Sequence, residues 1–149
     1  MIKPPAPLPT TGPMVFLAGS IEMGVAEDWQ SRVATAFADR DELVLLNPRR
    51  DAWDASWEQS IDNPVFREQV EWELDGLARA DVIALCLVPG TKSPISLLEL
   101  GLHAASGKVV VHCPEGFWRK GNVDVVCARF GIERHDTWED WISALRSRA

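Results

Sequence analysis

Two glutamates occupy positions where the surrounding residues predict an apolar side chain. Glu99 is the only charged residue in the stretch 93–105, which is otherwise mostly apolar or small and predicts a buried helix. Glu73 lies in a second expected helix, 63–80, and at about 100° per residue it faces the same side as Leu77. Burying a carboxylate costs several kcal/mol unless something compensates for it. Each glutamate is therefore either tied to a structural partner or presented to a cleft, and the repeated anomaly favours the cleft.

Two carboxyl groups that face one cleft can cleave a glycosidic bond. One attacks or stabilises the anomeric carbon, and the other delivers and removes a proton. An apolar setting raises the pKa of a carboxyl group, which suits a proton donor near neutral pH. Trp53 and Trp57, in the expected long loop 47–63, offer indole faces on which a nucleobase can stack. The pattern therefore indicates an N-glycosidic bond as the target.

Strands and helices that alternate along the chain must position these side chains. Expected strands are 14–18, 42–46, 82–88, 108–112 and a short edge strand 132–135; expected helices are 25–40, 63–80, 93–105, 122–130 and 136–148. This alternation predicts a single α/β domain, a Rossmann or flavodoxin-like sandwich. Its five-stranded sheet is expected to be mostly parallel, with helices on both faces. Ser93 is the expected N-cap of the Glu99 helix, because Pro94 follows it at the first helical position.

Ligands in such folds bind beyond the carboxyl ends of the strands. The side chains and turns expected at that edge form the candidate substrate site: Gly19, Ser20, Ile21, Trp53, Trp57, Gly90 and Ser93. Arg49 and Arg50, in the same loop as the tryptophans, could clamp an anion. For adjacent charged residues in a loop, however, solvation at the surface is the expected state.

Composition limits the remaining possibilities. Residues 1–13 contain five prolines and predict an extended or disordered arm, followed by one domain over 14–149. The formal net charge of −7 argues against a nucleic acid polymer as partner. The three cysteines lack metal-ligand spacing, so we expect no metal or other cofactor and reduced core thiols in a cytoplasmic protein. No apolar run approaches the ~18 residues of a membrane helix, so no membrane partner is expected.

Four short segments resemble one family when they are taken in order. The segments FLAGSI (16–21), ELDGLARAD (73–81) and LELG (98–101), with GK at 107–108, resemble the nucleoside 2-deoxyribosyltransferase superfamily. That superfamily also holds the 2′-deoxynucleoside 5′-monophosphate N-hydrolases. The resemblance covers roughly 14–130. It implies a compact Rossmann-like fold, a small nucleoside or nucleotide as substrate, and a homo-oligomer, dimer or higher, whose sites borrow a residue from a neighbour.

The resemblance also implies roles for individual residues. Glu99 resembles the nucleophile that forms a covalent deoxyribosyl intermediate, and Glu73 stands where the family has an aspartate as general acid and base. Gly19 and Ser20 match the first ligand-binding loop. Asn122 resembles the asparagine that transferases lend across the subunit interface.

Three departures leave the reaction and the donor open. Glu73 is one methylene longer than the family's aspartate, and Ser93 matches the hydrolases where transferases usually have Asp. Glu22 stands where the hydrolases place a basic residue, and this predicts a preference for unphosphorylated nucleosides. Transfer to a second base and hydrolysis both remain possible. A non-catalytic nucleotide-sensing module and an NAD-type glycohydrolase are the alternative functions.

Overall fold

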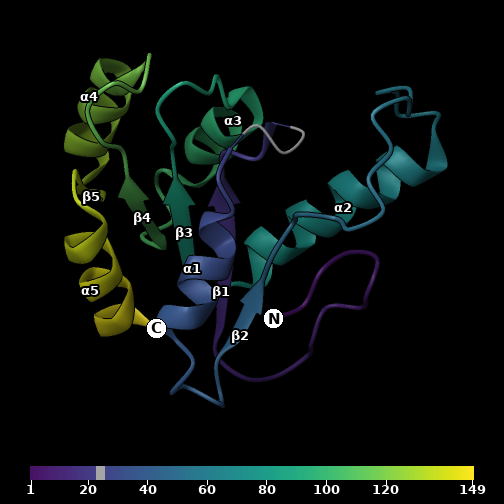
Figure 1. The fold of residues 1–149 in the computed structure, drawn as a ribbon, viewed down its shortest axis with the longest axis horizontal. Helices are drawn as coiled ribbons and strands as arrows, with labels where there is room; N and C mark the ends of the chain where they lie inside the picture. Colours follow the sequence, from purple (N-terminus) through teal and green to yellow (C-terminus); the bar gives the residue numbers. More distant parts are fainter. Residues whose placement is uncertain (23–25) are drawn as a thin grey trace.

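Five parallel strands form the centre of the molecule in a computed structural model that describes residues 1–22 and 26–149. The strands are β1 (Met14–Gly19), β2 (Val44–Leu46), β3 (Val82–Cys86), β4 (Val109–His112) and β5 (Glu133–His135). Their order in the sheet is β2-β1-β3-β4-β5, and every neighbouring pair is parallel (Figure 1). The predicted flavodoxin-like order is therefore confirmed.

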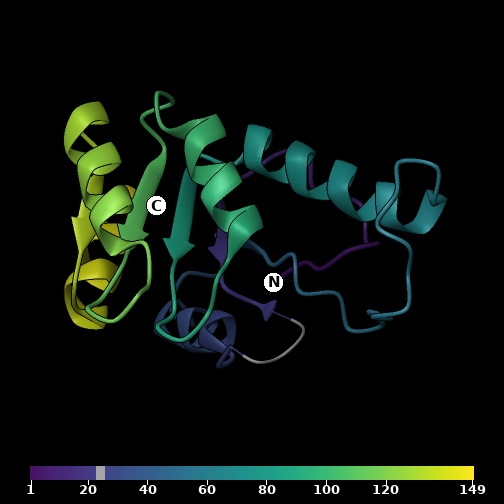
Figure 2. The same ribbon diagram turned by 90° about the horizontal axis from the view of Figure 1, so that it is seen from above.

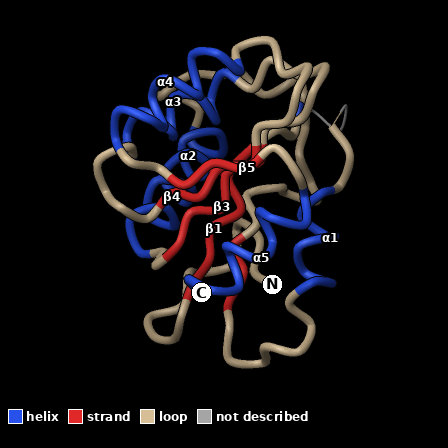
Figure 3. The backbone as a smooth tube through the Cα atoms, turned by 90° about the vertical axis from the view of Figure 1, so that its left-hand side faces the viewer, coloured by secondary structure: helices blue, strands red, loops and turns tan. Residues whose placement is uncertain are grey.

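Helices cover both faces of this sheet, as Figures 2 and 3 show. The helices of the described chain are α1 (Trp29–Ala36), α2 (Pro64–Arg79), α3 (Pro94–His103), α4 (Lys120–Phe130) and α5 (Trp138–Arg148). One core cluster joins the sheet to α2, α3 and α4, and a second joins it to α1 and α5. The two carboxylates of interest therefore lie on the same side of the sheet.

The uninterrupted apolar sequence of β1 follows from its burial on both faces of the sheet. Phe16 and Ala18 belong to the cluster beneath α2, α3 and α4, whereas Val15 and Leu17 belong to the opposite cluster. All four side chains are fully buried. A parallel strand covered on both faces has no solvated side, so the usual alternation of apolar and polar residues is absent.

Two glycines allow close contacts with the sheet, one between α2 and β1 and one between β1 and β3. A Cβ atom at Gly76 of α2 would lie 2.8 Å from Cε2 of Phe16, so this glycine lets the helix pack directly on β1. Gly19 has φ +144°, and a Cβ atom there would lie 2.1 Å from the carbonyl oxygen of Cys86. Any other residue at the end of β1 would therefore force it away from β3.

Several predicted boundaries shift. Helix α1 begins at Trp29, later than the predicted 25–40, because the side chain of Asp28 accepts a hydrogen bond from Ser31 N and caps the helix. Val25, the first residue of the predicted helix, and the two residues before it lie outside the described residues. Helix α4 begins two residues earlier than predicted.

The proline-rich arm is ordered and attached to the domain, and it contains a turn in which Ala6 N donates to the carbonyl of Lys3 at 3.0 Å. Ile2 N donates to the carbonyl of Leu45 at 2.8 Å, and Asn47 N donates to the carbonyl of Ile2 at 2.9 Å. The indole of Trp72 on α2 donates to the carbonyl of Ala6 at 2.8 Å. The arm therefore covers the outer edge of β2, which would otherwise present unpaired backbone groups.

The described residues contain neither a membrane-spanning helix nor a cluster of metal ligands. No helix there is long and apolar enough to cross a membrane. No group of three or more His, Cys, Asp or Glu residues lies close enough to hold a metal ion in the same part of the chain. Cys86, Cys113 and Cys127 are all buried and unpaired, as predicted for core thiols.

Candidate active site

A cavity of about 740 Å³ lies between α2, α3 and the loops that follow β1 and β2. Glu73 and Glu99 both line it, from neighbouring helices. The predicted substrate residues that also line the cavity are Gly19, Ile21, Trp53 and Ser93. The fold therefore brings both carboxylates and four of the predicted binding residues to one place.

Glu99 is the more isolated of the two carboxylates. Its side chain is buried, with 8% of the residue exposed, and accepts no hydrogen bond from the described residues. Burial raises its pKa to about 8, and the nearby charge of Glu73 contributes in the same direction. A carboxyl group in this setting resists ionisation because burial removes most of its solvation and no described residue donates a hydrogen bond to its charge.

Glu73 is held by a neighbour one helical turn away. Gln69 Nε2 donates to Glu73 Oε1 at 2.7 Å and also to the carbonyl of Pro48 at 2.9 Å. Burial raises the pKa of Glu73 to about 7, although the hydrogen bond from Gln69 acts to lower it. At neutral pH this group is therefore close to half protonated, as a proton donor and acceptor needs to be.

The helical-wheel prediction for α2 is partly wrong. It placed Glu73 in the middle of the core-facing stripe, but the buried residues of α2 are Gln69, Trp72, Gly76 and Leu77. Glu73 lies beside that stripe, on the side that lines the cavity. The anomaly that the sequence showed is thus a carboxylate facing a cavity, next to the core.

Ser20 shapes the site without lining the cavity. It is fully buried, and its hydroxyl shares hydrogen bonds with Thr91 Oγ1 at 2.9 Å and Ser93 Oγ at 2.6 Å. The same hydroxyl accepts a hydrogen bond from Val88 N at 2.9 Å. These contacts tie the end of β1 to the loop between β3 and α3, and so fix where the Glu99 helix begins.

Ser93 is not the side-chain N-cap that its sequence context predicted. It adopts a left-handed conformation with φ 49°, and its hydroxyl is engaged by Ser20 and Thr91 instead of the helix. Glu22 Oε1 accepts hydrogen bonds from Ser93 N at 2.7 Å and from Lys92 N, the two residues that precede Pro94, the first residue of α3. A carboxylate of this protein therefore binds the backbone of the loop directly before α3.

The two loop tryptophans have different roles. Trp53 lines the cavity, whereas Trp57 does not. Their rings meet edge to face with centroids 5.1 Å apart, and the guanidinium of Arg50 lies 5.3 Å from the Trp57 ring centroid. Trp57 therefore packs against Trp53 and does not itself line the cavity.

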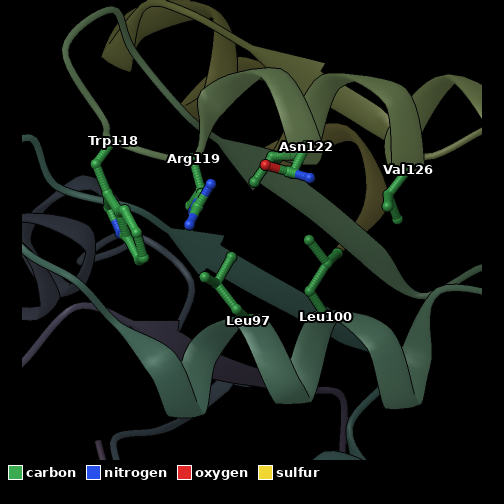
Figure 4. Close-up of a pocket in the computed structure, with 7 residues that line it drawn as sticks. Leu97, Leu100, Trp118, Arg119, Asn122 and Val126 are labelled. Atoms are coloured by element: carbon green, nitrogen blue, oxygen red, sulfur yellow. The ribbon is translucent and has the colours of Figure 1, made fainter.

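Gly90 and Asn122 lie away from the cavity. Gly90 is an exposed turn residue with φ +84°. Asn122 lines a separate pocket of about 280 Å³ between α3 and α4, with Leu97, Leu100 and Trp118 (Figure 4). Helix α3 lies between this pocket and the cavity that Glu99 lines.

Sequence reasoning underrated Arg49 and Arg50. Both line the cavity instead of standing in solvent. The side chain of Arg50 is only 11% exposed, and its Nη1 lies 3.2 Å from Glu68 Oε2. Gln69 was missed altogether. The one signal in the sequence was its place one turn before Glu73, at the spacing where helical side chains meet.

A family model described as nucleoside 2-deoxyribosyltransferase-like matches residues 12–117. The chain belongs to this family. The match runs from the start of β1 to the loop after β4, so it contains both carboxylates and the residues that line the cavity. The family acts on nucleosides, generally as a transferase or hydrolase.

One solved structure supports the fold. A conserved protein from Enterococcus faecalis V583 superimposes with a TM-score of 0.66 over 93% of this chain and 100% of that chain. The two sequences are 13% identical, so the likeness concerns the fold alone. A search of curated proteins found no match.

The first testable prediction is that Glu99→Gln changes how stability depends on pH. The folded state raises the pKa of Glu99 from 4.5 to about 8, so the wild-type protein loses stability as pH rises through this window. The variant lacks this loss. Its free energy of unfolding, measured by chemical denaturation, should equal that of the wild type at about pH 5. At about pH 8 it should exceed the wild-type value by a few kcal/mol.

Glu58→Gln is the matched control, because Glu58 is exposed in the loop before α2. It should leave the pH dependence unchanged. Parallel stability curves for Glu99→Gln and the wild type would show that Glu99 is not the desolvated group described above.

Proposed function

We propose that this protein cleaves the N-glycosidic bond of a deoxynucleoside by a retaining mechanism, with Glu99 as nucleophile and Glu73 as general acid and base. The single observation that carries this proposal is the pair of desolvated carboxyl groups that face one cavity from neighbouring helices. Trp53, on the cavity wall, offers a face on which the base can stack.

The reaction proceeds in two displacement steps. The Glu99 carboxylate forms an ester bond to C1′ as the bond between C1′ and the base nitrogen breaks, and the bonding electron pair leaves with the base. Glu73 gives its proton to the departing base. Water or a second base then attacks C1′ while Glu73 removes its proton, and Glu99 is released as a carboxylate.

The proton must lie on Glu73 when the nucleophile attacks. The pair titrates with pKa values of about 7 and about 8, so near pH 7.5 it holds about one proton. In the free protein Gln69 donates a hydrogen bond to Glu73, and no described residue donates one to Glu99, so the negative charge is favoured on Glu73, which is the unreactive arrangement. A sugar hydroxyl that donates to Glu99 would stabilise its ionised form and shift the proton to Glu73. Substrate binding thereby prepares the pair for reaction.

A homo-oligomer, implied by the family resemblance, fits the surface of α3. Ile95, Leu98 and Leu102 are each more than half exposed and follow one another at helical spacing along this helix. Leu74 of α2 is also exposed and, like them, lines the cavity. A second copy that covered this apolar stripe would also exclude water from the cavity.

The second prediction separates the roles of the two carboxyl groups. Glu99→Gln should abolish turnover of every nucleoside, because an amide cannot form the ester intermediate. Glu73→Gln should lose about 10²–10⁴-fold on ordinary deoxynucleosides, which need a proton on the leaving base. It should recover on 7-methyl-2′-deoxyguanosine, whose base already carries the positive charge. Release of the free base, followed by chromatography, measures both variants.

Recovery of Glu99→Gln instead of Glu73→Gln on the methylated substrate would exchange the two assigned roles. Binding of nucleosides without turnover by the wild type would point to a nucleotide-sensing module. Cleavage of NAD in place of deoxynucleosides would indicate the glycohydrolase alternative.

The third prediction concerns the 5′ position of the donor. The Glu22 carboxylate already occupies the backbone N–H groups of Lys92 and Ser93, in the loop directly before α3, and its charge would repel an anionic phosphate there. The wild type should therefore prefer a deoxynucleoside over its 5′-monophosphate by at least about fivefold in kcat/KM. Glu22→Gln removes the charge and should narrow this ratio.

Glu27→Gln serves as the matched control, because it removes an exposed carboxylate that does not line the cavity. It should keep the wild-type ratio. A clear advantage for the monophosphate in the wild-type protein would overturn the role given to Glu22.

A further inference from the structure

Most charged side chains on the cavity wall already have a partner. The guanidinium of Arg50 pairs with Glu68 at 3.2 Å, and the carboxylate of Asp51 pairs with Lys3. The carboxylate of Glu22 accepts hydrogen bonds from two backbone N–H groups. Among the described residues that line the cavity, one further charge remains besides the two carboxyl groups of the proposed mechanism.

That charge is the guanidinium of Arg49, which has no carboxylate partner. No carboxylate of the described residues lies within 4.0 Å of it, and the other three residues, 23–25, are Met, Gly and Val. Its side-chain contacts are long, from Nη2 to the carbonyl oxygens of Ala26 at 3.5 Å and Glu27 at 3.4 Å. A partly buried cation without an anion is unfavourable, so a ligand that brings an anion to this wall is favoured.

The backbone of Arg49 begins next to the proposed proton donor. Gln69 Nε2 donates to Glu73 Oε1 at 2.7 Å and to the carbonyl of Pro48 at 2.9 Å. That carbonyl belongs to the peptide group that joins Pro48 to Arg49, so one amide side chain links the proton donor to the backbone of Arg49. Because the Arg49 side chain lines the same cavity, a base that takes its proton from Glu73 lies within its reach.

We propose that Arg49 binds an anionic group on the leaving base, and that the substrate is a nucleoside whose base carries a carboxylate on the ring edge away from the glycosidic bond. A guanidinium presents paired N–H donors whose planar geometry matches a carboxylate. A neutral base in the same place leaves the charge of Arg49 without an anion. The inference rests on the proposed function and adds the class of base to it.

A matched pair of nucleosides tests this directly, and this is the fourth prediction. 5-Carboxy-2′-deoxyuridine and 5-carbamoyl-2′-deoxyuridine have the same size and differ by one unit of charge. The wild type should favour the carboxylate by at least about tenfold in kcat/KM, because only the carboxylate compensates the guanidinium. Arg49→Met should narrow this ratio, whereas Arg67→Met, on the exposed side of α2, should preserve it. Equal rates, or a preference for the amide, would overturn the inference.

A binding measurement separates this inference from the proposed function. Calorimetry with the free bases 5-carboxyuracil and 5-carbamoyluracil measures recognition of the anion without any catalytic step. Tighter binding of 5-carboxyuracil that is lost in Arg49→Met supports the anion site even if no nucleoside is turned over, an outcome that would refute only the proposed reaction. Equal binding of the two bases, binding of neither, or tighter binding of the amide refutes the anion site even in an active enzyme.

Discussion

Two carboxyl groups withdrawn from water and facing the same cavity impose the main constraint on this structure. Desolvation raises the pKa of both, and the charge of Glu73 adds to the shift at Glu99. Such a pair lowers the stability of the folded protein at neutral pH, so the surrounding framework must hold it in place. Gly76 does so for α2 by allowing direct contact with β1, and Ser20 does so for α3 through its three hydrogen bonds.

The start of α3 shows how charge is distributed around that pair. Its backbone donors would attract any anion, including the phosphate of a nucleotide. Glu22, in the loop after β1, accepts hydrogen bonds from Lys92 N and Ser93 N directly before the helix, so a carboxylate of the protein already stands beside this position. At the other side of the cavity, Arg49 brings positive charge without a carboxylate partner among the described residues. The cavity is thus polarised, with the carboxyl groups of Glu73 and Glu99 on one side and the guanidinium of Arg49 on the other.

The sequence was sufficient for the features that depend on local pattern. The apolar strands and the exceptional positions of Glu73 and Glu99 follow from periodicity within short windows. The parallel sheet follows from the alternation of strands and helices along the chain. Features that depend on contacts across the chain were not predictable in this way. The hydroxyl of Ser93 bonds to Ser20, 73 positions away, and this contact replaces the N-cap interaction expected of Ser93. Arg49 was expected in solvent because no local signal reveals that its loop folds over a cavity.

The central claim is that Glu99 becomes covalently bound to the sugar. A 2′-deoxy-2′-fluoroarabinosyl nucleoside tests it most directly, because fluorine next to C1′ destabilises the oxocarbenium-like transition states and lets the intermediate accumulate. Mass spectrometry after proteolysis should find the fluorinated sugar on the peptide that contains Glu99, with release of one equivalent of base. Base release without an adduct, or an adduct on another residue, would contradict this account.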